Sequence, residues 1–258
     1  MSEQPAVLTE RHGNVLVVRL NRPDARNAVN GAVATGIEAA IDALEADDTL
    51  ACGVLAASGP IFCAGADLKL IAAGRGGEMA TERGGFAGLV RRRRAKPLVA
   101  AIHSDALAGG FEIALACDLL VAAAGARLGL PEVKRSLVAL GGGLVELPRL
   151  VGEKLALELA LTGDPIAVER LERAGLVSRV VPAADVEREA LALAARIGGN
   201  GPLAVRASYR IIRESRDADT DASWALSMTI GLPVFASEDA REGARAFLEK
   251  RAPVWRGR

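Results

Sequence analysis

The chain has 258 residues, of which 50% are apolar and 25% are charged, a composition typical of globular proteins. Its 32 basic and 32 acidic side chains cancel to a net charge of zero, which argues against a nucleic-acid or anionic-membrane binder that works through a general basic field. Aromatic residues make up only 3%, so stacking platforms for bases or sugars are not expected either.

The N-terminal half alternates strand-like and helix-like runs. Short apolar runs at 14–20, 50–57, 97–102 and 119–124 predict strands, and apolar residues at helical spacing predict a helix over 32–44. Strands separated by helices are typical of a parallel sheet with crossover connections, so we predict an α/β fold.

The pattern becomes helical from about residue 150. Asp164 as N-cap, Pro165 as first helical residue and Gly175 beyond the end predict one helix, and residues 185–197 predict the next. A break at residues 198–202 (GGNGP) precedes a helical tail, whose last helix has Ser237 as its cap. We therefore predict a boundary between residues 1–198 and residues 199–258.

Two segments lack clear periodicity. Residues 75–88 are rich in glycine, and residues 91–94 are four consecutive arginines. Such a run indicates a solvated helix face, or else a site that attracts an anionic ligand, since arginine pairs well with phosphate.

The three cysteines are odd in number, far apart and never in a CxxC pair, which predicts free thiols in a reducing compartment. The first residues, MSEQPAVLTERHG, contain no apolar signal-peptide core, and no apolar run reaches transmembrane length. We expect a cytoplasmic protein without a membrane partner.

Several common site types are excluded by their motifs. The chain has no GxxxxGK[ST] loop, no GxGxxG after a strand and no GxSxG elbow. With only His12 and His103, histidine metal clusters and serine triads are nearly excluded. A catalyst built from this chain must rely on backbone groups and carboxylates.

Two glycine-containing turns each follow a predicted strand, FCAGADL at 62–68 and ALAGGFE at 106–112. Small residues there would let a ligand approach the main chain, and a helix that begins near Gly109 leaves its first N–H groups unpaired. Two such donors from separate turns can form an oxyanion hole. The alternative is that both are ordinary strand-to-helix turns.

Two glutamates, Glu112 and Glu132, lie among apolar neighbours, where an unpaired carboxylate is expensive to bury. Each could be satisfied by a basic partner, since Lys134 and Arg135 lie close to the second. Together they could form a carboxylate pair with a raised pKa suited to acid–base chemistry. Sequence spacing does not decide between these interpretations.

Five motifs resemble, in order, the signatures of the enoyl-CoA hydratase/isomerase (crotonase) superfamily. They are LNRPDARNA (20–28), FCAGADLK (62–69), LAGGFEIALACD (107–118), PE (131–132) and the C-terminal pair SEDAREG (237–243) and AFLEKR (246–251). The likeness covers essentially the whole chain and is closest to hydratases. Phe111 and residues 252–258 are also similar to the carnitinyl-CoA dehydratase branch.

The resemblance implies a spiral of ββα repeats followed by a helical trimerisation region, with trimers commonly paired into hexamers. Residues 1–198 would form the spiral core with the CoA and catalytic site, and residues 199–258 the oligomerisation region. It also implies an enzyme of fatty-acid metabolism whose substrate is a coenzyme A thioester, with no metal or redox cofactor and no nucleic-acid partner.

The resemblance also assigns roles to individual residues. The thioester oxygen would lie between the N–H groups of Ala66 and Gly109. Glu112 would take a proton from water as it adds to the β-carbon of a trans-2-enoyl-CoA, and Glu132 would deliver a proton to the α-carbon. The implied substrate- and CoA-binding residues are Arg22, Ala25, Arg26, Ala28, Ala64, Asp67, Leu68, Leu140, Phe247 and Lys250.

Within that set, Ala64 would lie beside the adenine, and Leu140 would help to hold the catalytic water through its backbone. Phe247 and Lys250 would reach the nucleotide, in a neighbouring subunit. Aliphatic side chains near residues 75–90 would line much of the acyl tunnel.

The chain departs from the family pattern at several positions. Ala139-Leu140 stands where a Pro-Gly pair is usual, Glu146 replaces an arginine, and Asp24 stands where a lysine often meets the CoA. Two alternatives to hydration therefore stay open: dehydration or isomerisation of an unusual acyl-CoA, and a non-catalytic acyl-CoA-binding homologue.

Overall fold

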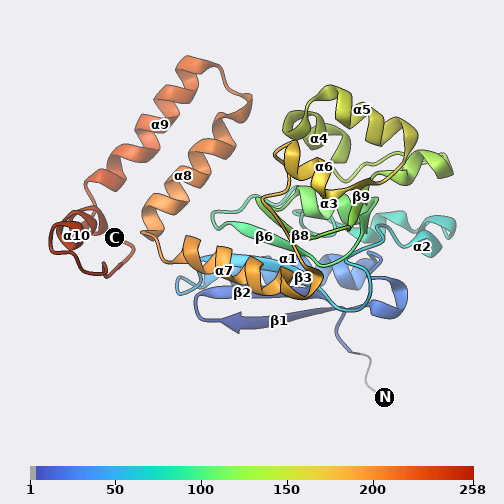
Figure 1. The fold of residues 1–258 in the computed structure, drawn as a ribbon, viewed down its shortest axis with the longest axis horizontal. Coiled ribbons are helices and arrows are strands. Elements are labelled where there is room, and N and C mark those ends of the chain that lie inside the picture. The colour runs from blue at the N-terminus through green and yellow to red at the C-terminus, as the bar shows by residue number, and fades with distance from the viewer. Residues whose placement is uncertain (1–3) are drawn as a thin grey trace.

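A six-stranded sheet forms the centre of the computed structural model, which describes residues 4–258 (Figure 1). The first two strands pair antiparallel, and the other neighbours pair parallel. In spatial order the strands are β1 (Val7–His12), β2 (Val15–Leu20), β3 (Cys52–Ala57), β6 (Leu98–Ile102), β8 (Leu119–Ala123) and β11 (Arg179–Val181).

Two smaller sheets flank it. One has the order β10 (Ile166–Ala167), β9 (Arg127–Gly129) and β7 (Ala106–Leu107), and the other pairs β4 (Ala80–Thr81) with β5 (Gly85–Phe86). These short strands hold the loops that carry the candidate site, so their pairing decides where those loops lie.

The described part of the chain contains ten α-helices. They are α1 (Gly31–Ala46), α2 (Leu68–Ala72), α3 (Gly109–Leu115), α4 (Gly143–Val151), α5 (Glu153–Thr162), α6 (Val168–Arg173), α7 (Val186–Gly198), α8 (Pro202–Glu214), α9 (Thr220–Phe235) and α10 (Glu238–Leu248). Helix α7 packs against β3, β6 and β8. None of the helices in residues 4–258 is long and apolar enough to cross a membrane.

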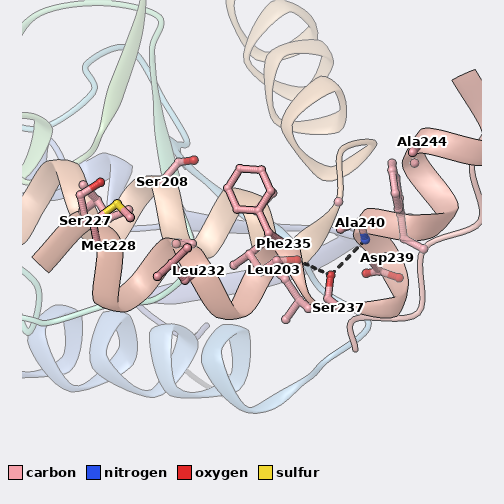
Figure 2. Close-up of a pocket in the computed structure, with 18 residues that line it drawn as sticks. Leu203, Ser208, Ser227, Met228, Leu232, Phe235, Ser237, Asp239, Ala240 and Ala244 are labelled. Carbon is pink, nitrogen blue, oxygen red and sulfur yellow. Dashed lines mark hydrogen bonds between the residues drawn. The ribbon is translucent and has the colours of Figure 1, made fainter.

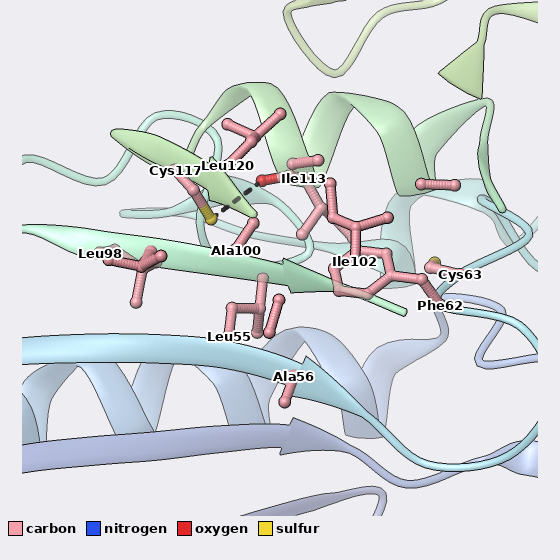
Figure 3. Packing of buried hydrophobic residues seen from close by; sticks show 14 of the residues in the cluster. Leu55, Ala56, Phe62, Cys63, Leu98, Ala100, Ile102, Ile113, Cys117 and Leu120 are labelled. Atoms are coloured by element: carbon pink, nitrogen blue, oxygen red, sulfur yellow. Dashed lines mark hydrogen bonds between the residues drawn. The ribbon is translucent and has the colours of Figure 1, made fainter. Parts of the chain in front are cut away.

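The core lies between the sheet and its helices (Figure 3). Every residue of β3 and β6 is buried, which explains why these strands appear in the sequence as continuous apolar runs rather than alternating ones. Aliphatic side chains such as Leu55, Ile102 and Ile113 dominate, with Phe62 and Phe111 among the few buried aromatics. All three cysteines are buried free thiols, as predicted.

Helices α8, α9 and α10, here called the C-terminal arm, extend away from the sheet (Figure 1). Large apolar side chains of α9 face solvent, among them Trp224, Leu232 and Phe235. The arm begins at the predicted break, since α7 ends at Gly198 and α8 begins at Pro202.

The chain end folds back on the arm. Asp239, almost fully buried, accepts hydrogen bonds from the backbone N–H groups of Arg256 (2.7 Å) and Gly257 (2.8 Å). The Trp255 indole N–H donates to the Gly199 carbonyl (2.9 Å). These bonds tie the last residues to the start of α10 and to the break before α8.

The predicted helix beginning at Pro165 was wrong by several residues. Ile166 and Ala167 form strand β10 against β9, and helix α6 begins only at Val168. Asp164 is not its cap, because its carboxylate pairs with Lys134. The signals correctly predicted a helix in this region but placed its start too early. The first predicted helical residues instead form a strand that pairs with β9.

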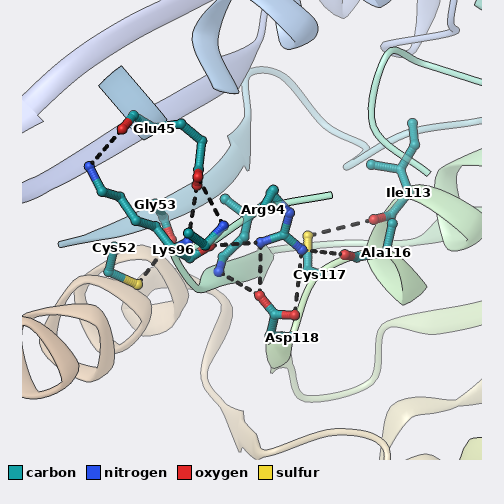
Figure 4. A network of polar contacts seen from close by, with 11 residues as sticks. Glu45, Cys52, Gly53, Arg94, Lys96, Ile113, Ala116, Cys117 and Asp118 are labelled. Atoms are coloured by element: carbon teal, nitrogen blue, oxygen red, sulfur yellow. Dashed lines mark hydrogen bonds and ion pairs between the residues drawn. The ribbon is translucent and has the colours of Figure 1, made fainter. Parts of the chain in front are cut away.

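The arginine run is not a solvated helix face, because it lies in an irregular segment and half of it forms ion pairs. Arg92 pairs with Asp42, and the buried Arg94 donates to Asp118 (2.9 Å) and to the Ala116 carbonyl (2.8 Å; Figure 4). Lys96 is buried in the same network.

Candidate active site

The two glycine-containing turns lie directly against each other. Cys63 forms an isolated parallel bridge with Ala106, and the Leu107 N–H donates to the Cys63 carbonyl (3.0 Å). A Cβ atom on Gly65 would lie 2.7 Å from the Ala108 Cβ and 2.8 Å from the Gly109 nitrogen. Position 65 also has φ at +96°, so glycine is the only residue type that fits there without displacing the second turn.

Each turn leaves one backbone donor without a partner. Within residues 4–258, neither the Ala66 N–H nor the Gly109 N–H donates to a protein acceptor. A Cβ atom built on Gly109 would lie 3.4 Å from the Ala66 nitrogen, so the two groups are near neighbours. Unpaired amide donors are rare inside proteins, and a pair of them can bind a developing negative charge.

The second turn has a strained backbone that hydrogen bonds hold in place. Ala108, the residue before α3, has φ 52° and ψ −130°, a region that non-glycine residues adopt at a cost of about 1–3 kcal/mol. Its N–H donates to the Gly129 carbonyl of β9 (2.9 Å), and its own carbonyl accepts from Phe111 (2.9 Å) and Glu112 (3.1 Å). These bonds fix the direction in which the Gly109 N–H enters the helix.

Glu112 is buried in the first turn of α3, with 4% of its surface exposed. Its Oε1 accepts a hydrogen bond from the Gly143 N–H (2.9 Å). Burial raises the pKa of Glu112 to about 7, and the negative charge of Glu132 adds to this, while the amides of Gly143 and Gly141 act in the opposite direction. Glu112 can therefore exchange a proton near neutral pH.

Glu132 is half-buried in the 3₁₀ helix η3 (Pro131–Arg135), and its Oε2 is buried without a hydrogen-bond partner. Burial raises its pKa, opposed in part by the charge of Arg135. Lys134 pairs with Asp164 instead. In the described residues, neither glutamate forms an ion pair, so the interpretation that basic partners satisfy them does not hold.

Three glycines bring the main chain close to Glu112. A Cβ atom on Gly141 would lie 2.5 Å from Glu112 Oε2, and one on Gly143 would lie 3.2 Å from Oε1. Between them, Gly142 has φ at +101°. The unusual residues Ala139-Leu140 therefore do not disturb the contacts of Glu112 with Gly141 and Gly143. The Leu140 side chain is 88% exposed.

The first group of predicted CoA-binding residues lies in one loop. Buried Asn27 organises it, accepting from the Arg22 N–H (2.9 Å) and donating to the carbonyls of Ser58 (2.7 Å) and Ile61 (2.9 Å). The Ala64 N–H donates to the Arg26 carbonyl (3.0 Å), which brings the two predicted segments together. Sequence reasoning did not single out Asn27.

The same loop contacts the first glycine-containing turn. Val29 and Ala66 form an isolated parallel bridge, with Ala25 and Ala28 half-buried just before it. The Arg22 guanidinium donates to the Ala28 carbonyl (2.5 Å) and lies 3.3 Å from Asp67. Asp67 caps α2 by accepting from the Lys69 N–H (3.2 Å), and the Leu68 side chain is half-exposed beside it.

Two predicted residues lie elsewhere. Phe247, 83% exposed, and Lys250 lie at the end of α10, on the side of the molecule opposite to α2 and α3 in Figure 1. The protein chain itself therefore does not bring them to the turns.

Two cavities differ in their relation to the glutamates. One, of about 580 Å³, has Glu132 and Gly143 in its wall, together with apolar side chains of η3, α4 and α5. The other, of about 650 Å³, lies between α8, α9 and α10 and is lined by apolar residues such as Met228, Leu232 and Phe235 (Figure 2). Only the first adjoins the candidate site.

The sequence model of the enoyl-CoA hydratase/isomerase family matches residues 10–258. The chain belongs to this family. It is 40% identical to the enoyl-CoA hydratase EchA19 of Mycobacterium tuberculosis, over 98% of the chain and 97% of that protein. It is 36% identical to a carnitinyl-CoA dehydratase of Salmonella typhi, over 96% of the chain and 97% of that protein.

The crystal structure of the enoyl-CoA hydratase EchA1 from Mycobacterium marinum has the same fold, with a TM-score of 0.95 and 47% sequence identity over 99% of the chain and 100% of that structure. The predicted crotonase-like α/β fold with helices at its C-terminus is therefore confirmed. The chain is an enzyme of the enoyl-CoA hydratase type, a hydro-lyase.

Proposed function

We propose that this member of the family adds water reversibly to a trans-2-enoyl-CoA, with Ala66 and Gly109 as the oxyanion hole and Glu112 and Glu132 as the acid–base pair. One observation carries the proposal: Glu112 lies in the first turn of the helix that begins at the unpaired Gly109 donor, and burial and the charge of Glu132 raise its pKa. Such a pair can hold one proton between its members near neutral pH.

The amides supply electrostatic stabilisation. With the thioester oxygen between them, the β-carbon becomes electrophilic, and the enolate formed on addition is stabilised where its charge develops. Each such donor contributes about 2.7–4 kcal/mol in other acyl systems. This step requires no metal or redox cofactor, so the CoA thioester and water are the only reactants that the proposal needs.

The glutamates move the protons. Ionised Glu112 takes a proton from water while the hydroxyl oxygen bonds to the β-carbon, and protonated Glu132 gives its proton to the α-carbon. After hydration Glu112 holds a proton and Glu132 does not, which is the starting state for dehydration. Because the two glutamates exchange protonation states in each reaction, the same site can catalyse both hydration and dehydration.

The remaining predictions stay proposals. We propose that Arg22, Arg26, Ala64 and their neighbours bind the CoA, and that Leu140 holds the water through its backbone. We also propose that the enzyme works in the cytoplasm on acyl-CoA without nucleic-acid or membrane partners. A homotrimer, or a dimer of trimers, would place Phe247 and Lys250 of one subunit at the nucleotide of the next.

A second candidate is dehydration or isomerisation of an unusual acyl-CoA, favoured by the likeness to the carnitinyl-CoA dehydratase. Mass spectrometry of the product separates the reactions, because isomerisation leaves the mass unchanged while hydration adds one water. A non-catalytic homologue predicts acyl-CoA binding by calorimetry that is unaffected when both glutamates are replaced.

The test is the loss of enoyl-thioester absorbance with purified enzyme, alongside Glu112→Gln and Glu132→Gln. We expect turnover by the wild type and a kcat lower by about 10²–10⁴-fold in each variant, because general acid–base catalysis typically contributes this much. Absence of turnover on short, medium and branched enoyl-CoAs would overturn the hydratase assignment.

A further inference from the structure

The aromatic ring of Phe86 lies at the candidate site, although the sequence motifs did not mark it. A Cβ atom on Gly109 would lie 2.5 Å from Phe86 Cζ, so the ring covers the α-carbon of one proposed oxyanion donor. A Cβ atom on Gly141 would lie 3.1 Å from Phe86 Cδ1 and 2.5 Å from Glu112 Oε2. The ring and the Glu112 carboxylate therefore border the same small volume.

The segment that carries this ring is tightly packed. A Cβ atom on Gly84 would lie 2.2 Å from the Gly88 carbonyl, and one on Gly88 would lie 2.2 Å from the Ala34 carbonyl of α1. Ala87, fully buried, donates its N–H to the Met79 carbonyl (2.8 Å), and Phe86 pairs with Ala80 between β5 and β4. The glycine-rich segment is thus anchored against helix α1 through Gly88, which fixes the position of the ring that it carries.

The space that remains beside the glutamates is the cavity next to Glu132. Its apolar lining includes Leu130, Val133, Leu144, Leu147, Leu157 and Leu161. Its ionisable residues are Glu132 and Glu153, and no lysine, arginine or histidine of the described chain lines it. A negatively charged acyl end would find no positive partner there and would lie near Glu153, whereas an aliphatic end would bury apolar surface.

We propose that Phe86 is a specificity-determining residue that closes the Glu112 side of the acyl site, so that the enzyme takes uncharged acyl groups with a single β-substituent and directs their tails into the cavity beside Glu132. This inference rests on the proposed hydratase function, because it uses the position that a thioester between Ala66 and Gly109 would take. A second group on the β-carbon would collide with the ring or with the Glu112 carboxylate.

The test compares wild type with Phe86→Ala and Phe86→Leu on crotonyl-CoA and 3-methylcrotonyl-CoA. We expect the kcat/KM ratio of the branched to the unbranched substrate to rise about ten-fold or more in Phe86→Ala, and less in Phe86→Leu, since one methyl group in a pocket is typically worth a 10- to 200-fold preference. Phe111→Leu, an aromatic truncation in the core one residue from Glu112, should leave the ratio unchanged.

A cavity-filling variant tests where the tail goes. Ala160→Phe, at the half-buried wall of the cavity, should lower kcat/KM for trans-2-octenoyl-CoA about ten-fold or more and leave crotonyl-CoA unaffected. On wild type, an enoyl-CoA with a terminal carboxylate should react more slowly than one of equal length without it.

The outcomes separate this inference from the function on which it rests. If wild type hydrates crotonyl-CoA but Phe86→Ala leaves the branched-to-unbranched ratio unchanged, the role of Phe86 is wrong and the hydratase stands. If wild type hydrates no enoyl-CoA, the proposed function fails. Calorimetric affinities for isovaleryl-CoA and butyryl-CoA then still test Phe86, whose role fails if their ratio is equal in wild type and Phe86→Ala.

Discussion

Burial is the main cause of the raised pKa of Glu112, and the backbone amides of Gly143 and Gly141 oppose it only in part. Its pKa is about 7 in the folded enzyme against an ordinary value near 4.5, so the folded state binds the proton more tightly than the unfolded state. The stability that this proton provides is complete below about pH 4.5 and is lost as the pH rises through 7. The same proton must leave before Glu112 can act as a base.

We therefore expect kcat/KM for hydration to fall as the pH drops below about 7, and Glu112→Gln to unfold at a higher urea concentration than wild type at pH 8. The gain should be about 3 kcal/mol at pH 8 and should disappear below about pH 4.5, because the amide is uncharged and can still accept from Gly143. Urea titrations at several pH values measure it, with the exposed Glu82→Gln as the matched control. A pH-independent difference would contradict this account.

At the scale of elements, a buried lysine closes the end of helix α1. The Lys96 ammonium donates to the carbonyls of Leu44 (2.7 Å), Glu45 (3.2 Å) and Asp47 (2.8 Å). The Glu45 side chain in turn accepts from the backbone N–H groups of Ala95 and Lys96 (Figure 4). The last carbonyls of a helix have no partners within it, so this one side chain satisfies groups that would otherwise be buried unpaired.

Lys96→Met should destabilise the fold by about 2–4 kcal/mol, because the carbonyls lose a charged donor in a place that water does not reach. Urea unfolding measures the loss, and Lys154→Met, at an exposed position of α5, should change stability by less than about 0.5 kcal/mol. Equal stability of the two variants would show that the α1 cap is unimportant.

Comparison of individual elements shows which parts of the fold could be predicted from the sequence alone. Strands β3 and β6 were predictable because burial on both faces leaves a short apolar run, and the cap at Ser237 was predictable because its bond to Ala240 is local. The two turns that carry the backbone donors could be predicted from their glycines, and both glutamates from their position among apolar residues. Phe86 and Lys96 could not be found, since their contacts come from segments far along the chain.

At the scale of the whole molecule, the C-terminal arm exposes more apolar surface than a monomer normally keeps. Trp224, Leu232 and Phe235 are between 56% and 83% exposed, and the cavity between α8, α9 and α10 is apolar as well. Clustered exposed apolar residues are typical of protein–protein interfaces. This surface supports the proposed trimer, in which Phe247 would reach the nucleotide bound by a neighbouring subunit.

We expect light scattering to give a mass near three or six times the 26.7 kDa chain. Leu232→Asp with Phe235→Asp should shift the enzyme toward monomer and raise KM for crotonyl-CoA, because a neighbour's Phe247 and Lys250 would no longer reach the nucleotide. Leu8→Asp, on strand β1 and 37% exposed, is the control that should change neither. A monomeric wild type with normal KM would remove the trimer from the proposal.

The two donors of Ala66 and Gly109, unpaired within residues 4–258, belong to the main chain, so replacements of surrounding side chains that keep the two turns in place leave the proposed oxyanion hole available. No side-chain replacement deletes an amide hydrogen, and only proline removes it outright. If the proposed oxyanion hole is correct, descendants of one gene can exchange the residues around the acyl group, and so acquire new substrates, while inheriting the same pair of amide donors. Divergence of this enzyme from its relatives is then expected to accumulate in cavity walls rather than at the point where the reaction begins.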